Sequence, residues 1–430
     1  MQDTPVIAQQ VAVLSESAAE LVRRGQEDDA AKVYERIFEI APYNLNALEF
    51  LAKRAFERGD TDTCLRLVER TRQANPERPK TYLDLSIIHM TRGEHDLALE
   101  MVNKGLQLKP VFPYAMLQKG AVLEEMGHEQ GALQAYFQAF KWAPGLRQPP
   151  EQMGELALRG DNLIKQTRLK MLDAALEMVR NGRDPDELRR IQEFVDLYLG
   201  RRAPQYPHAA QRPSFLYFPG LAPRPFFERE EFDWCQGLET ATIDIRTELE
   251  ALLKSPEALK PYVDINAADT AQWTGLNKSL QWSSFHLYKA GEKIEENCRR
   301  CPATLAAVEK LPLPHMPGHT PEIFFSILKP GTHIPPHFGL GNHKLAVHLP
   351  LIVPPDCAIR VGNETRNWEA GRCLIFDDSF RHEAWNKSGE LRAVLILDIW
   401  HPQLTEPERT AVTATLDVTR ELNRRYGAIG

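Results

Sequence analysis

Apolar residues recur along this chain in two patterns, which change over near residue 205. Before that point the spacing is helical, as over residues 163–176 and 186–199. From about residue 214, short β-rich runs are separated by turn residues, which is typical of a sandwich or barrel. Such strands are predicted at 282–288, 323–328, 344–353, 358–361, 373–376 and 392–399. The pattern therefore predicts a helical part followed by a β domain.

The first third of the chain repeats with a period of 34 residues. The repeated positions are glycines, prolines and small residues: Gly25, Gly59, Gly93 and Gly127; Pro42, Pro76, Pro110 and Pro144; Ala30, Cys64, Ala98 and Ala132. Glycine permits the turn after one helix, the small residue lets two helices approach closely, and proline stops the second helix. In period and residue type, the stretch from about Ser15 to Pro144 resembles the tetratricopeptide repeat.

Repeats of this kind stack into a superhelix with a concave groove that usually holds a peptide or another protein. We expect such a partner here, with a spacer or a dimerisation surface as the alternatives. The predicted domains are 1–145 for the repeats, 146–208 for a helical bridge and linker, and 209–430 for the β domain. The tail from Thr405 opens like a capped helix, which we expect to pack outside the β domain.

Composition excludes several classes of protein. The 430 residues are 43% apolar and 26% charged, which is ordinary for a soluble protein of two or more domains. A net charge of −7 without a basic stripe indicates no nucleic-acid partner. No segment approaches the roughly 20 apolar residues of a membrane helix, and residues 1–10 do not predict a secretory signal. Six cysteines do not make a disulfide framework, so a cytoplasmic location is expected.

Two histidines and an arginine are the strongest candidates for chemistry. His337 lies in a Pro-Pro-His-Phe-Gly motif, His382 follows 45 positions later, and Arg392 stands ten positions beyond at the head of an apolar run. Two imidazoles brought together on a small barrel can hold Fe(II), and a strand arginine can bind the far carboxylate of 2-oxoglutarate. The usual third ligand, a carboxylate two residues after the first histidine, is replaced by Gly339. That gap indicates either a dead site or a site in which water takes the third position.

Residues 282–402 resemble the catalytic domain of the aspartyl/asparaginyl β-hydroxylases. The matching stretches are Lys329–His333, His337-x-Gly339, His348–Leu351, Asn363–Thr365, Phe376–Glu383 and Trp400–Pro402. The resemblance implies a double-stranded β-helix, or jelly roll, with Fe(II) and 2-oxoglutarate as cofactors. It also implies activity with only two histidine ligands, so that Gly339 is expected. Known members also have tetratricopeptide repeats before the catalytic domain.

The resemblance assigns roles to single residues of this sequence. His337 and His382 match the two iron ligands. Arg392 matches the residue that pairs with the distal carboxylate of 2-oxoglutarate, a task that suits a planar bidentate guanidinium. Ser326 matches a hydroxyl that helps to hold the same cosubstrate, and His348 matches an imidazole near the metal-binding end of that molecule.

Substrate recognition is where this chain departs from the family. Some relatives have arginine at the positions of Lys344 and Ala346. Strand alternation should place both residues on the same face as His348, with Leu345 and the alternate residues on the other face. Lys344 is therefore predicted to pair with an acidic substrate, as a point charge without the guanidinium fork.

Other polar motifs have simpler interpretations. Asp377 and Asp378 could be metal ligands, but we expect them to cap a turn and orient the loop before His382. Cys298 and Cys301 form a single C-x-x-C motif without the second pair that a structural zinc site needs, so a mobile loop with two reduced thiols is expected.

The resulting hypothesis is an Fe(II)- and 2-oxoglutarate-dependent dioxygenase. Its predicted reaction hydroxylates the β-carbon of Asp or Asn residues in a peptide or protein, with release of succinate and CO2, and the repeats help to present the substrate. One alternative keeps the chemistry on a small molecule, such as a free amino acid or a lipid acyl chain. The other is a non-catalytic repeat scaffold whose barrel binds no metal.

Overall fold

The computed structural model describes residues 4–147, 154–265 and 271–427. Its internal contacts divide the chain into two units, Met1–Met171 with Glu421–Gly430, and Leu172–Arg420. The domain limits expected from the sequence stay predictions, and residues 148–153 of the expected bridge lie outside the described residues. Each unit is described separately below.

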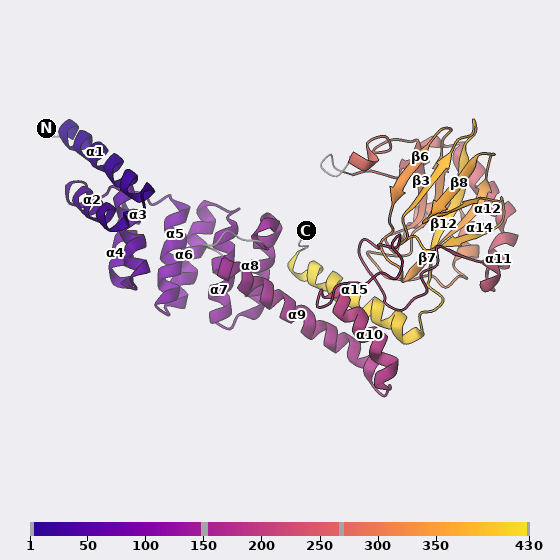
Figure 1. The fold of residues 1–430 in the computed structure, drawn as a ribbon, viewed down its shortest axis with the longest axis horizontal. Helices are drawn as coiled ribbons and strands as arrows, with labels where there is room; N and C mark the ends of the chain where they lie inside the picture. Colours follow the sequence, from indigo (N-terminus) through magenta and orange to yellow (C-terminus); the bar gives the residue numbers. More distant parts are fainter. Residues whose placement is uncertain (1–3, 148–153, 266–270, 428–430) are drawn as a thin grey trace. The chain divides into compact units, whose positions relative to one another are not determined.

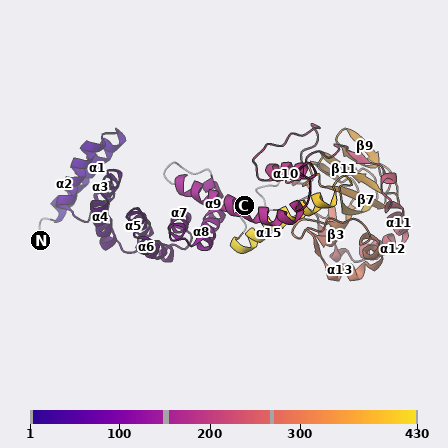
Figure 2. The ribbon, with the colours of Figure 1, turned by 90° about the horizontal axis from the view of Figure 1, so that it is seen from below.

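The first unit is a stack of helical hairpins, which Figure 1 shows from the side and Figure 2 from below. Its helices are α1 (Thr4–Arg23), α2 (Glu27–Ile40), α3 (Leu45–Glu57), α4 (Thr61–Ala74), α5 (Pro79–Thr91), α6 (His95–Leu108), α7 (Pro113–Glu125) and α8 (Glu129–Trp142). A short 3-10 helix, η1 (Pro144–Arg147), follows. The helical repeats predicted from the sequence are confirmed.

The repeated residues occupy the positions that their chemistry predicts. Each repeated glycine lies two residues beyond the first helix of a hairpin and has a φ angle between 73° and 76°, in the left-handed region that glycine tolerates best. The small residues five positions later are buried, with exposed fractions of 0–3%. Each repeated proline follows the end of the second helix by two residues. The turn after the first helix, the close approach of the two helices and the end of the second helix therefore recur at the same positions in each hairpin.

Tyr136 of α8 is packed between two glycines of the same unit. A Cβ atom added at Gly120 of α7, or at Gly160 of α9 (Gly154–Arg180), would lie 2.6 Å from the Tyr136 ring. The ring is fully buried, and its hydroxyl donates to Glu124 Oε2 at 3.0 Å. A side chain at either position would collide with the Tyr136 ring, so both positions require glycine.

We expect Gly120→Ala to destabilise the repeat unit. Alanine gains about 1 kcal/mol of helix propensity over glycine, but the displaced ring and its hydrogen bond should cost about 2–3 kcal/mol, so the net loss is about 1–2 kcal/mol. Urea unfolding followed by circular dichroism measures it. Gly145→Ala is the matched control, since a Cβ at Gly145 contacts nothing within 4 Å. Equal stability of the two variants would contradict this account of the packing.

The second unit contains two antiparallel sheets. The strands are β1 (Phe226–Phe227), β2 (Lys260–Pro261), β3 (Trp282–Lys289), β4 (Glu292–Lys293), β5 (Ile323–Leu328), β6 (His333–His337), β7 (Lys344–Ile352), β8 (Cys357–Val361), β9 (Glu364–Asn367), β10 (Leu374–Phe376), β11 (His382–Asn386) and β12 (Arg392–Trp400). The large sheet has the order β1-β10-β7-β12-β5-β3-β2, with β4 paired to β3, and the small sheet has the order β6-β11-β8-β9. Two such sheets are the layers of a jelly roll, and the α plus β fold class is confirmed.

Helices cover one face of the large sheet, and the small sheet covers the other. Apolar residues of α11 (Cys235–Thr240), α12 (Thr242–Leu253), α13 (Glu295–Arg300) and α14 (Pro302–Val308) share one core with Leu345, Val347 and Leu349 of β7. A second core, between the sheets, contains Ala346. The predicted alternation along β7 is therefore confirmed, and it directs the polar residues of this strand into the space between the sheets.

The remaining elements complete the second unit. They are α10 (Pro185–Tyr198), α15 (Glu406–Tyr426), which extends into the first unit, and the short 3-10 helices η3 (Arg229–Glu231), η4 (Pro256–Ala258) and η6 (Ala271–Trp273). The helix predicted at 163–176 lies within α9, and the helix predicted at 186–199 is α10. Among the described residues, no helix is both long and apolar enough to span a bilayer.

The expectation of a mobile loop around the C-x-x-C motif is wrong. Cys298 lies within α13, and Cys301 lies at the junction with α14. Both thiols are free and at most 2% exposed, packed in the core between the helices and the large sheet. Burial raises the pKa of Cys298 and raises that of Cys301 to about 12, so both stay protonated and unreactive at neutral pH. The motif is therefore part of the core.

Candidate active site

A cavity of about 240 Å³ lies between the two sheets of the second unit. Its walls come from β3, β5, β7, β10 and β12 of the large sheet and from β6, β8 and β11 of the small sheet. The structure brings every site residue expected from the sequence to this one cavity, namely Ser326, His337, Lys344, His348, His382 and Arg392. Residues separated by up to 66 positions therefore share one chamber.

His337 and His382 form a cross-strand pair. They are direct register partners at the ends of β6 and β11, and their ring centroids are 4.1 Å apart. Nδ1 of each ring bonds to a backbone carbonyl two residues earlier, Pro335 O at 2.9 Å and Phe380 O at 2.8 Å. Because a carbonyl only accepts, both Nδ1 atoms are the protonated nitrogens, and both Nε2 atoms keep a free lone pair. Two oriented Nε2 lone pairs on neighbouring strands can bind one metal ion.

The environment also keeps this histidine pair neutral. Burial lowers the pKa of His337 to about 3, and the neighbouring His382 adds to the effect. Burial lowers the pKa of His382 to about 4. Both imidazoles are thus unprotonated at pH 7, so a metal ion would not have to displace a proton from either ligand.

Gly339 supplies no third ligand, and its neighbourhood explains why a side chain is excluded there. A Cβ at Gly339 would collide with the carboxylate of Asp378, whose backbone carbonyl accepts from Gly339 N at 2.6 Å. Within the described ranges, no set of three or more His, Cys, Asp or Glu residues could hold a metal ion. These residues therefore offer a metal ion two imidazole ligands, and oxygen atoms of small molecules would occupy its other coordination positions.

Arg392 is a buried cation without an anionic partner among the described residues. Its side chain is 1% exposed, its Nε has no hydrogen-bond partner, and its Nη1 donates to Ser326 O at 3.2 Å. The guanidinium lies over the Trp368 ring, 4.5 Å from its centroid. Burial lowers its pKa to about 9, so the group is still charged at pH 7. An isolated buried charge is costly, so this residue is arranged to receive an anion.

Two further donors lie beside this guanidinium. Ser326 Oγ accepts from Arg392 Nη1 at 3.3 Å and from Trp282 Nε1 at 3.1 Å, so its own O–H remains free to donate. Trp368 Nε1 donates to His348 Nδ1 at 3.2 Å, which places the proton of the neutral His348 ring on Nε2. Burial, with Arg392 nearby, lowers the pKa of His348 and keeps the ring neutral. The cavity thus offers a guanidinium, a hydroxyl and an imidazole N–H to an oxygen-rich ligand.

Lys344 has two carboxylate partners of its own. Its Nζ lies 3.0 Å from Asp378 Oδ2 and 2.7 Å from Asp398 Oδ1, and the residue is only 5% exposed. Although burial opposes it, the two carboxylates raise the pKa of Lys344. The expectation that Asp378 caps a turn is therefore wrong, because its carboxylate is turned to Lys344 on the cavity wall. The use of Lys344 by a substrate stays a prediction.

Asp377 does cap the turn before His382, as expected. Its Oδ1 accepts from Ser379 N at 2.9 Å, and its Oδ2 accepts from Gln211 Nε2 at 2.8 Å. Burial raises its pKa to about 7. The residue therefore fixes the loop that carries Asp378 and His382 and lies outside the cavity lining.

Comparisons with known proteins found matches to both parts of the chain. Residues 239–402 match the family model of the aspartyl/asparaginyl beta-hydroxylases. A mouse aspartyl/asparaginyl beta-hydroxylase is 43% identical over 141 residues, 32% of this chain and 19% of that protein. An ornithine lipid ester-linked acyl 2-hydroxylase of Rhizobium tropici is 38% identical over 197 residues, 45% of this chain and 66% of that protein. The tetratricopeptide-repeat protein YrrB is 15% identical with a TM-score of 0.30, over 38% of this chain and 92% of that chain.

The chain thus spans about a fifth of the mouse relative and 66% of the bacterial one. Every cavity residue discussed above lies inside the range that the family model matches. Over residues 239–402, which include the whole candidate site, this protein matches the aspartyl/asparaginyl β-hydroxylase family.

Proposed function

We propose that the β domain is a hydroxylase that depends on Fe(II) and 2-oxoglutarate. The proposal depends on one observation, which is that the neutral pair His337/His382 and the unpartnered cation Arg392 line the same cavity. The two neutral imidazoles can bind a metal ion. The distal carboxylate of a keto diacid would pair with Arg392 and remove the electrostatic cost of this buried charge. The hydroxylase family match supports the same chemistry.

Each residue then has a defined task. His337 and His382 would hold the metal through Nε2, in the orientation fixed by their Nδ1–carbonyl bonds. Arg392 and the free O–H of Ser326 would bind the distal carboxylate of 2-oxoglutarate, and His348 Nε2–H would donate to an oxygen of the same molecule. Fe(II), when bound, would supply the coupling of O2 reduction to the conversion of 2-oxoglutarate into succinate and CO2, with transfer of one oxygen atom to the substrate. Apolar walls, among them Phe376 and Ile396, would exclude water from this reaction.

The relatives' names indicate which substrates to test first. The name of the mouse relative indicates aspartyl and asparaginyl residues of a peptide or protein, hydroxylated at the β-carbon, as the first substrates to test. A partner presented by the groove of the repeat unit suits such a substrate. A small molecule or lipid acyl chain is the second candidate, which is favoured by the larger share of the Rhizobium tropici protein that this chain covers.

Mass spectrometry after incubation with Fe(II), 2-oxoglutarate and air tests the proposal. The full chain is given Asp and Asn peptides, free amino acids and an acyl lipid, and succinate is measured in parallel. We expect a gain of one oxygen atom in one substrate class, with an equal amount of succinate. Absence of Fe(II) binding in an anaerobic titration, together with absence of succinate, would favour the non-catalytic scaffold.

A further inference from the structure

The cavity has two ends of different charge. Arg392 and Asp398 both belong to β12 and both line the cavity, six residues apart on one face of the strand. At roughly 3.3 Å per residue, their Cα atoms are about 20 Å apart along the strand. His348 lies between them, because it is the register partner of Ile396. The Arg392 end is the end assigned above to 2-oxoglutarate, so the Asp398 end remains for the substrate.

Carboxylates outnumber cations at the Asp398 end. Among the described residues that line this end of the cavity, Lys344 is the one Lys or Arg, and it pairs with both Asp378 and Asp398. Glu322 also lines the cavity and adds a third carboxylate, and its backbone N–H donates to Asp398 Oδ2 at 2.9 Å. The Glu322 carboxylate accepts from Ala290 N at 2.7 Å and lies 3.4 Å from His286 Nε2. Three carboxylates against one ammonium leave an excess of two negative charges among these four groups. In a partly dehydrated cavity, such an excess repels an anionic ligand.

One carboxylate oxygen at this end is unused. Asp378 Oδ2 bonds to Lys344, but Asp378 Oδ1 is buried and has no hydrogen-bond partner in the structure. That oxygen is packed against the backbone of Gly339, where an added Cβ would lie 2.5 Å from it. Because Asp378 lines the cavity, its carboxylate adds negative charge to the wall, although this oxygen is not open to a ligand.

Aromatic rings adjoin the same carboxylates. Tyr262, Trp282 and Phe324 line the cavity, and the Tyr262 ring stacks at 4.0 Å on Trp282 and at 5.1 Å on Phe324. Glu322 and Asp398 line the same cavity as this ring, and burial and these two carboxylates raise the pKa of Tyr262. Aromatic faces attract cations and do not attract carboxylates. The rings and the acidic wall therefore favour the same sign of charge in a ligand.

We propose that the substrate presents an ammonium group to the acidic wall formed by Asp378, Asp398 and Glu322, beside the Tyr262 ring, and that an acidic side chain is rejected there. This inference rests on the proposed function, because it assigns the Arg392 end to 2-oxoglutarate. Lys344 then neutralises part of the acidic wall and does not recognise an acidic substrate. Ala346, on the same face of β7, adds no cation. The ammonium group belongs either to a side chain of a peptide or to the α-nitrogen of an amino acid.

Isothermal titration calorimetry of the full chain with four small probes tests the proposal. The first three probes are the N-acetyl, N-methylamide forms of aspartate, asparagine and 2,4-diaminobutyrate, which have similar size and charges of about −1, 0 and +1 at pH 7. The fourth, asparagine N-methylamide with a free α-nitrogen, places the cation on the backbone. We expect one cationic probe to bind at least about tenfold more tightly than the aspartate probe. The tighter of the two cationic probes identifies the source of the ammonium group.

Asp378→Asn keeps the shape of the wall and removes the negative charge, so it should reduce that preference to about threefold or less. Glu250→Gln is the matched control, since Glu250 is an exposed carboxylate of α12 that pairs with Arg246, and it should keep the full preference. The proposal is overturned if the aspartate probe binds as tightly as the cationic probes. It is also overturned if neither cationic probe binds, or if Asp378→Asn leaves the preference unchanged.

The titrations are run without metal and again with Fe(II) and 2-oxoglutarate under argon, so that two failures can be told apart. A preference for ammonium probes in a protein that forms no succinate would count against the proposed function and not against the charge of the wall. Succinate formation driven by an aspartyl peptide, without any preference for ammonium probes, would count against this inference alone.

Discussion

His382→Ala is expected to abolish substrate-dependent succinate formation. The described residues offer a metal two imidazoles, His337 and His382, so the loss of one leaves a single protein ligand. Removing groups that merely orient a ligand already costs about 10- to 100-fold, and removing a ligand should cost at least about 100-fold in Fe(II) affinity and in turnover. Anaerobic Fe(II) titration and a succinate assay measure the two losses independently.

His333→Ala is the matched control for that substitution. His333 lies on the same strand as His337, but its side chain is 53% exposed and bonds to Glu383 outside the cavity lining. We expect the control to keep most of its Fe(II) affinity and activity. Full activity in the His382→Ala variant would remove the oxygenase assignment, whatever the control does.

Arg392→Met is expected to separate cosubstrate binding from stability. Loss of one partner from a buried charge pair costs about 2–5 kcal/mol, so the apparent Kd for 2-oxoglutarate should rise by roughly 30-fold or more. The ligand-free protein should lose little, because methionine fills similar volume and removes a buried charge that lacks an anionic partner. We expect its free energy of unfolding to stay within about 1 kcal/mol of the wild-type value, or to rise.

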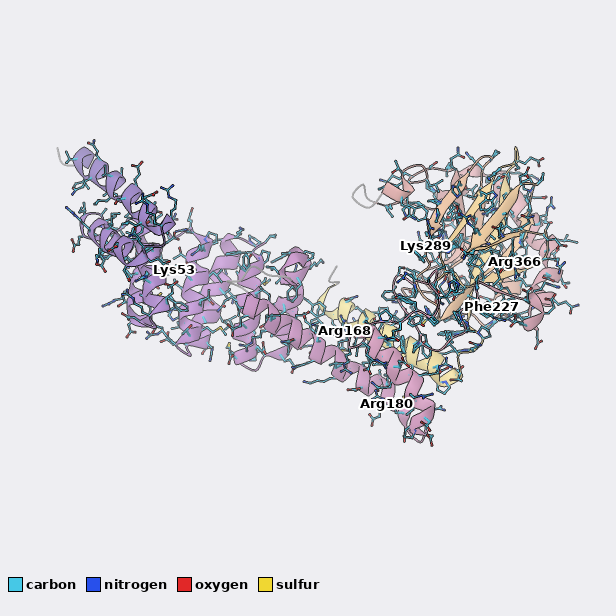
Figure 3. All side chains as sticks on the ribbon, in the orientation of Figure 1. Lys53, Arg168, Arg180, Phe227, Lys289 and Arg366 are labelled. Carbon is cyan, nitrogen blue, oxygen red and sulfur yellow. The ribbon has the colours of Figure 1, made fainter. Side chains whose placement is uncertain are left out.

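Thermal unfolding with and without 2-oxoglutarate, using Mn(II) in place of Fe(II), measures both quantities. The wild-type Tm should rise on addition of 2-oxoglutarate, and the Tm of the variant should not. Arg366→Met is the control, since Arg366 lies on the edge strand β9 (Figure 3) and pairs with Glu228 and Glu364. A large loss of stability in ligand-free Arg392→Met would instead make Arg392 a structural residue.

The helical repeats could be predicted from the sequence because the pattern that indicates them is local. A glycine, a small residue and a proline at fixed spacing each act within one hairpin, and the period repeats them four times. The central strands were readable for a similar reason, since a long apolar run such as 323–328 is a strand wherever it lies in the sheet, and β5 has the same bounds. These features need no knowledge of which segments become neighbours.

The strands that carry the two histidines were not predicted. β6 contains Pro335 and Pro336, and β11 mixes charged, aromatic and polar residues, so neither has the alternation of a typical strand. Both lie in the small sheet, where β6 is an edge strand that tolerates proline. The histidines were found through motifs and resemblance, and their cross-strand register follows only from the fold.

The acidic end of the cavity was also missed, although part of its signal was present. Alternation along 392–399 places Asp398 on the same face as Arg392, which marks it as a cavity residue once that strand is recognised. Glu322 and Tyr262 come from segments with no such pattern, and no property of Asp378 in the sequence shows that it turns to Lys344. Side-chain pairing across loops depends on packing that periodicity does not describe.

The boundary between the two units is crossed by the chain twice, within α9 and within α15. The last turns of α15 therefore belong to the core of the first unit, where Tyr426 stacks on Phe137 at 5.2 Å. A gene fragment that stops after residue 171 would lack Tyr426 and its ring contact with Phe137. The repeat array expressed in that way would therefore be an incomplete folding unit. Anyone who expresses the array alone would need to supply the carboxy-terminal segment as a separate peptide or as a fusion.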